Sequence, residues 1–104
     1  MNAQRRKTID TILAKLDGVA ALVAPLETLL EELQSAINDV SGEEQETFDN
    51  MPEGLQNGEK GGKVQEALTA FENAVNSLDE LTGTIGGVSD TIEEVKGYLE
   101  EAKS

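Results

Sequence analysis

The sequence predicts an all-α protein built as an antiparallel two-helix hairpin, and three observations lead to this fold class. Aliphatic residues in the first half recur at alternating spacings of three and four, the second half carries a similar stripe, and a Pro- and Gly-containing stretch separates the two. Aromatic residues make up only 3% of the 104 residues, so the core is expected to be aliphatic. The first series is Ile9, Ile12, Leu16, Val19, Val23, Leu26, Leu30, Leu33, Ile37 and Val40.

The first helix is expected to span residues 8–49, with Thr8 as its N-cap. Pro25 removes one backbone hydrogen bond and clashes with the preceding turn. Because the apolar spacing continues on both sides of it, we expect a kink near residue 25 rather than a break.

The turn is expected to cover residues 50–61. Pro52 disfavours a helical conformation at Met51, and Asn50 is expected to cap a short helical turn with Glu53 at the reciprocal capping position. Asn57-Gly58 is a typical chain-turning pair. Three apolar side chains are expected to close this end of the hairpin: Phe48, Met51 and Leu55.

The second helix is expected to span residues 62–102. Folding the chain back about residue 56 sets Pro25 opposite Gly87, within a patch that also contains Gly83 and Gly86. We therefore expect close helix packing at these glycines. The apolar stripe of this helix is Val64, Leu68, Phe71, Val75, Leu78, Leu81, Ile85, Val88, Ile92, Val95, Leu99 and Ala102.

A single domain of residues 1–104 is predicted, and a hairpin of this size buries only one seam per helix. Further apolar residues flank both seams and would stay exposed to water in a monomer. The simplest consequence is a homo-oligomer, such as a dimer that forms a four-helix bundle. The flanking positions are Leu13, Leu22, Leu29, Ala67, Ala70 and Ala74.

The charge is strongly acidic, with 21 Asp and Glu against 8 Lys and Arg, a formal net charge of −13. No basic residue occurs between Lys15 and Lys60. This field disfavours direct binding to nucleic acid or to an anionic membrane. The same charge suggests an alternative function, in which acidic helix faces imitate DNA and block a DNA-binding protein.

Catalytic chemistry finds little support in the residue types. Cys and His are absent, which excludes thiolate chemistry, His-based nucleophilic catalysis and the usual helical metal motif. The paired carboxylates, such as Glu31 with Glu32, fall on polar helix faces, where nothing would tune them for acid–base catalysis. The sequence therefore predicts a protein that is not an enzyme and carries no cofactor or metal.

The segment from Glu43 to Gln56 carries a sequence motif that resembles a known group. Its core, Phe48-Asp49-Asn50-Met51-Pro52-Glu53-Gly54-Leu55-Gln56, is followed by Glu59-Lys60-Gly61 and an amphipathic helix. It resembles a pattern in small uncharacterised acidic helical proteins of phages and prophages, over about residues 40–80. The resemblance implies a viral accessory context and a location in the cytoplasm of the host cell.

The predicted function is that of a non-enzymatic, phage-type accessory protein that binds a host protein, such as a defence or regulatory component. Three alternatives stay open beside it: the DNA mimic, a structural or assembly coiled coil, and sequestration of a small molecule at an oligomer interface. The candidate partner-binding residues lie in the turn: Phe48, Asp49, Asn50, Met51, Glu53 and Leu55.

Overall fold

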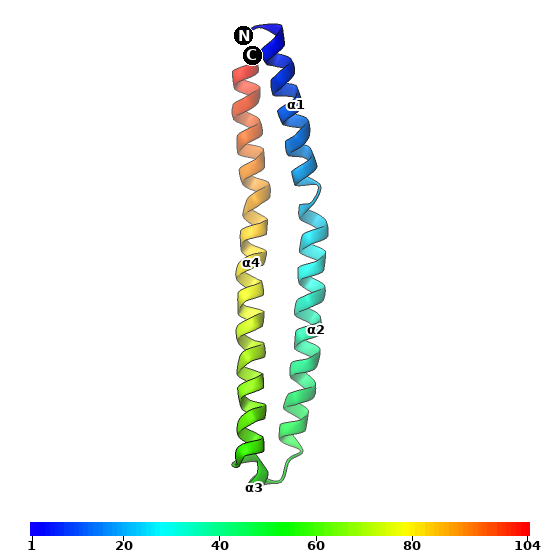
Figure 1. Ribbon diagram of the computed structural model, residues 1–104, viewed down its shortest axis with the longest axis vertical. Helices are drawn as coiled ribbons and strands as arrows, with labels where there is room; N and C mark the ends of the chain where they lie inside the picture. The colour runs from blue at the N-terminus through cyan, green and yellow to red at the C-terminus, as the bar shows by residue number, and fades with distance from the viewer. The chain divides into compact units, whose positions relative to one another are not determined.

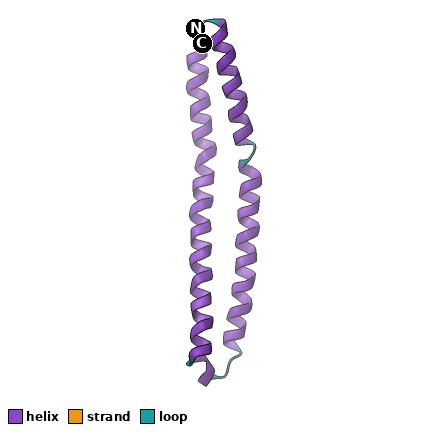
Figure 2. Ribbon diagram, in the orientation of Figure 1, coloured by secondary structure: helices purple, strands orange, loops and turns teal.

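The computed structural model describes all 104 residues, and nearly all of them are helical (Figure 1). Helix α1 spans Ala3–Ala20, α2 spans Val23–Asp49, α3 spans Glu53–Gln56 and α4 spans Glu59–Lys103. There is no β-strand (Figure 2). The predicted all-α class is confirmed.

The first helix begins five residues before the position expected from sequence. Asn2 is the N-cap, and its side-chain oxygen accepts a hydrogen bond from the backbone N–H of Arg5 at 2.8 Å. Thr8 lies inside the helix, where its hydroxyl donates to the carbonyl of Gln4 at 3.2 Å. The prediction of Thr8 as the cap was wrong because Asn2, an equally suitable capping residue, is available upstream.

The first helix is interrupted at Ala21 and Leu22, between α1 and α2, so the expectation of a kink near residue 25 rather than a break was wrong. A proline has no N–H to donate to the carbonyl four residues earlier, and its ring crowds that carbonyl. For Pro25 this position is Ala21. The disturbance therefore falls one turn before the proline, and α2 continues through it.

The turn between α2 and α4 contains the short helix α3. Asn50 donates its N–H to the carbonyl of Glu46, so it continues the last turn of α2. Pro52 is the N-cap of α3 and makes no side-chain capping bond. The predicted capping role of Asn50 was therefore wrong. Gln56 closes the turn by donating from Nε2 to the carbonyl of Phe48 at 2.8 Å.

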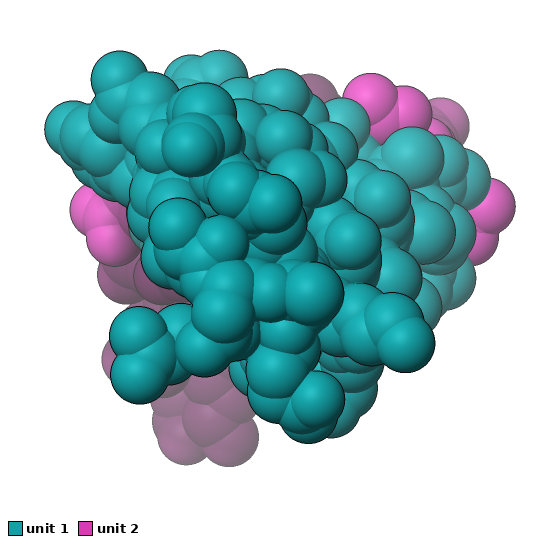
Figure 3. Space-filling view, turned by 90° about the horizontal axis from the view of Figure 1, so that it is seen from above, with its two compact units in different colours: residues 1–29, 82–104 teal, residues 30–81 magenta.

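The chain divides into two compact units, coloured separately in Figure 3. Unit 1 comprises residues 1–29 and 82–104, and unit 2 comprises residues 30–81. In unit 1, Asp17 pairs with Lys96 and Asp10 pairs with Lys103. From the first pair to the second, the residue number falls from 17 to 10 on one segment and rises from 96 to 103 on the other. The two segments of unit 1 therefore run antiparallel.

The buried core of unit 1 is small and aliphatic. Ile9, Val23 and Ile92 are its buried residues. The glycines expected to allow close packing do not do so: a Cβ added at Gly87, Gly86 or Gly83 would meet no atom within 4 Å. That expectation was wrong, because the chain backbones do not approach closely at these positions.

Unit 2 joins residues 30–49 of α2 to residues 59–81 of α4 through the turn and α3. Leu30 is buried, and Gln34 donates from Nε2 to Asp79 Oδ1 at 2.6 Å. At the turn, Phe48 and Met51 are half-buried, whereas Leu55 is exposed. Two of the three side chains expected to close this end therefore do so.

Candidate functional site

The structure places the six predicted partner-binding residues in one turn of unit 2. Phe48 and Asp49 end α2, Asn50 and Met51 form the connection, and Glu53 and Leu55 lie in α3. Four of them are exposed on the surface: Asp49, Asn50, Glu53 and Leu55. The Asp49 carboxylate already accepts a hydrogen bond from Gln45 Nε2 at 3.0 Å. The turn is thus a polar, accessible surface with one exposed apolar side chain.

Only half of the ten aliphatic residues in the predicted first series face the opposite helical segment. One heptad row is buried or half-buried: Ile9, Leu16, Val23, Leu30 and Ile37. The other is between 41% and 51% exposed: Ile12, Val19, Leu26, Leu33 and Val40. In its place a different row is half-buried: Leu13, Ala20, Glu27, Gln34 and Ser41. The helices are rotated so that one apolar row faces outward and a row that is only partly apolar enters the seam.

Two ion pairs close one edge of unit 1. Lys96 Nζ lies 2.7 Å from Asp17 Oδ1, and Lys103 Nζ lies 2.8 Å from Asp10 Oδ1. The hydrogen bonds to these carboxylates and their negative charge raise the pKa of both lysines above the ordinary value of 10.5. Arg6 adds a bond from Nε to the carbonyl of Lys103 at 3.3 Å. We call this side of unit 1 the ion-paired edge.

The opposite edge of unit 1 is apolar. In an antiparallel pair, positions on the same rotational side of each helix meet at the same edge. Asp10 and Asp17 lie on one rotational side of the buried row that contains Ile9 and Leu16, and the exposed leucines lie on the other side. On α4, Lys96 and Tyr98 likewise lie on opposite rotational sides. Leu22 and Tyr98, at 61% and 63% exposure, are the most exposed large apolar residues here. We define the apolar edge as Ile12, Val19, Leu22, Leu26, Leu29, Val95 and Tyr98.

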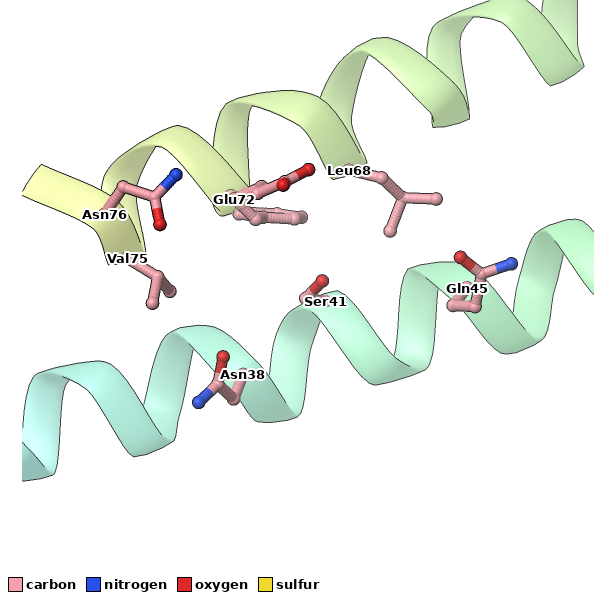
Figure 4. Close-up of a pocket in the computed structure, with 8 residues that line it drawn as sticks. Asn38, Ser41, Gln45, Leu68, Glu72, Val75 and Asn76 are labelled. Carbon is pink, nitrogen blue, oxygen red and sulfur yellow. The ribbon is translucent and has the colours of Figure 1, made fainter.

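Unit 2 contains a groove of about 340 Å³ between its two helical segments (Figure 4). Every lining residue from α2 is polar, whereas Leu68, Phe71 and Val75 of α4 are apolar. Ser41 of α2 and Leu68 and Val75 of α4 point into the space between the segments. The small Ser41 cannot fill the volume opposite the larger α4 side chains, which leaves the groove. Its remaining lining residues are Asn38, Gln45, Glu72 and Asn76.

The negative charge is concentrated in unit 2. Residues 30–81 contain 13 Asp and Glu against 2 Lys, a net charge of −11, whereas unit 1 contains 8 acidic and 6 basic residues, a net charge of −2. Most of the carboxylates of unit 2 therefore have no basic residue of the same unit to pair with. An electrostatic field of this sign attracts basic groups.

No group of three or more carboxylate residues is arranged to hold a metal ion. None of the helices combines the length and the apolar character that crossing a lipid bilayer requires.

No family model, curated protein or solved structure matches this chain.

The groove is the feature that sequence reasoning missed. A signal for it was present: the apolar row of α2 ends at Val40, while the stripe of α4 continues through Val75, Phe71 and Leu68 toward the turn. Two stripes of unequal length that pair in antiparallel fashion must leave part of the longer one without an apolar counterpart. The apolar edge had a clearer signal, since Leu22 and Leu29 were expected to stay exposed, and they do. Leu13, expected to be exposed with them, is half-buried.

Proposed function

We propose that this protein is a non-enzymatic, phage-type accessory protein that binds a host protein through unit 2. The whole chain forms one antiparallel hairpin that associates with further copies of itself. The observation that carries the binding function is the groove, because it combines apolar side chains without an apolar counterpart and a strongly acidic surrounding surface. The phage context rests on the resemblance of the turn.

The groove suits an apolar side chain presented by a basic segment of the partner. Burial of the partner's apolar group against Leu68, Phe71 and Val75 would provide affinity, at about 25 cal/mol per Å² of buried apolar area. The amide groups of Asn38 and Gln45 can both donate and accept hydrogen bonds, as a peptide backbone requires. The net charge of −11 in unit 2 would steer a basic partner to the site.

Filling the groove from within tests this function. In the Ser41→Leu variant, an apolar side chain of α2 would occupy the space opposite Phe71, so unit 2 should become more stable while the partner is excluded. Ser35→Leu makes the same change at an exposed position outside the groove and is the matched control. The readout is capture from a bacterial lysate, quantified by mass spectrometry, with thermal unfolding measured in parallel.

The expected result is a set of proteins enriched by the wild type and by Ser35→Leu, and lost with Ser41→Leu. The enriched proteins should be released as the salt concentration rises, because screening weakens attraction between exposed charges. Equal capture by all three proteins would contradict a role of the groove. Capture of no protein by the wild type would contradict the proposed function as a whole.

A second candidate function is the imitation of DNA, favoured by the concentration of charge on α2. Seven carboxylates lie on this helix between Glu31 and Asp49, with no basic residue among them. A mimic would bind DNA-binding proteins through these charges, and added duplex DNA would compete. Neutralising Glu31 and Glu43 to Gln should weaken such binding, whereas Ser41→Leu should leave it intact. A captured protein that DNA does not displace would speak against mimicry.

A further inference from the structure

The apolar edge of unit 1 is the largest group of exposed apolar side chains in either unit. Five of its residues come from α1, Leu22 and the start of α2, and two come from α4. The ion-paired edge on the other side of the same unit is polar. Unit 1 therefore has one face suited to water and one suited to burial against a partner.

The charge of unit 1 indicates what that partner is. Repulsion between two copies of this chain is weaker at unit 1, which has a net charge of only −2, than at unit 2, which has a net charge of −11. A face that carries apolar residues from both antiparallel segments is also self-complementary under a two-fold axis. We propose that two copies of this chain associate through the apolar edge, with α1 of each copy packed against α4 of the other.

The charges that flank the apolar edge determine which helices face each other. Lys15 is exposed on α1, three residues after Ile12 and four before Val19, and it makes no ion pair within the chain. On α4, Glu94 and Glu101 lie one turn to either side of Tyr98. Pairing α1 with α4 of the second copy brings opposite charges together, whereas pairing α1 with α1 would set Lys15 near Lys15.

The register within unit 1 supports this pairing. The residue numbers of both ion pairs add to 113, so Lys15 lies at the level of residue 98 of its own copy. Rotation about a two-fold axis parallel to the helices leaves the position of each residue along that axis unchanged, so equivalent residues of the two copies lie at the same level. Lys15 would then face Tyr98 of the second copy and reach Glu94 or Glu101 beside it. The same level rule sets Val19 beside Val95 of the second copy.

This inference rests on the self-association in the proposed function and adds the location and pairing of the interface. It is tested by analytical ultracentrifugation of the full chain. The Leu22→Gln and Leu29→Gln double variant changes two side chains that are 61% and 54% exposed, so the helices should be unaffected, which circular dichroism checks. The dimer dissociation constant should rise at least 100-fold, since four leucines leave the interface. Leu55→Gln, an exposed leucine of unit 2, is the matched control and should change nothing.

The pairing of helices has its own test by charge reversal. Lys15→Glu should weaken the dimer, and combining it with Glu94→Lys and Glu101→Lys should restore it. Absence of restoration would overturn the pairing of α1 with α4. A wild-type dimer that the leucine variants leave unchanged would overturn the location of the interface while self-association stands. A wild type that is monomeric at 100 μM would overturn self-association itself.

Discussion

The two units of this protein share helices α2 and α4 but differ in charge and packing. Unit 1 has a net charge of −2, cross-helix ion pairs on one edge and exposed leucines on the other. Unit 2 has a net charge of −11 and a groove where a serine of α2 faces large apolar side chains of α4. A near-neutral apolar face favours association of like with like, whereas an acidic groove favours a basic partner of a different kind.

One helical pattern accounts for both of the proposed binding surfaces. In unit 1, the helices are rotated so that Asp17 and Asp10 meet Lys96 and Lys103, while apolar residues face outward. In unit 2, the same rotation brings Ser41 inward and leaves space beside Phe71. Both proposed interfaces therefore follow from a single feature, the occupation of the seam by a row that is only partly apolar.

The largest expected effect concerns packing in the two units. Ile92 of unit 1 is only 6% exposed, and its replacement by Ala should lower the free energy of unfolding by about 2–3 kcal/mol, through lost burial and the cavity left behind. Leu68→Ala in unit 2 should cost only about 1 kcal/mol, because Leu68 already borders the groove. Urea unfolding followed by circular dichroism measures both. Equal losses of unfolding free energy in the two variants would contradict a difference in packing between the units.

An intermediate effect is expected at the turn of unit 2. A Cβ at Gly61 would overlap the carbonyl group of Gln56, so Gly61→Ala forces the end of α3 away from the start of α4. The expected loss is about 1–3 kcal/mol. The neighbouring Gly62→Ala meets no atom within 4 Å and should instead stabilise α4 by about 0.5–1 kcal/mol. Thermal unfolding measures the change in stability of both variants relative to the wild type. A Gly61→Ala variant as stable as the wild type would show that the turn adjusts to the added methyl group.

The smallest effect concerns the ion-paired edge of unit 1. Because the folded-state pKa values of Lys96 and Lys103 are raised above 10.5, their stabilising contribution is fully present below pH 10.5 and is lost as the pH rises through the folded-state values. Replacing both by Met should therefore reduce the loss of stability between about pH 9 and pH 12. Lys63→Met is the control, since Lys63 pairs with Glu59 of its own helix in unit 2. The free energy of unfolding, measured with urea across this pH range, should fall less steeply with pH for the double variant than for the wild type. The Lys63→Met control should behave as the wild type does.

Much of the helical structure could be predicted from the sequence. The end of the first helix at Asp49, the turn around Pro52 and the course of the second helix follow from local signals: apolar spacing, proline and glycine. The errors were also local. Thr8 and Asn50 are good capping residues that the chain does not use, because other residues end or begin the helices first. The turn lies where it was predicted and four of its six candidate residues are exposed, whereas its role in binding stays a prediction.

The sequence by itself determined that one side of each helix is apolar, because the spacing of residues along a chain fixes which of them share a helix face. It could not determine which of two neighbouring rows enters the seam, since burial of apolar area has no directional preference. Only the tertiary structure decided this, in an arrangement that also brings together distant residues such as Asp17 and Lys96. That rotation left Ile12, Val19 and Leu26 exposed and opened the groove beside Ser41. The proposed binding surfaces exist because of a rotation that no single helix encodes.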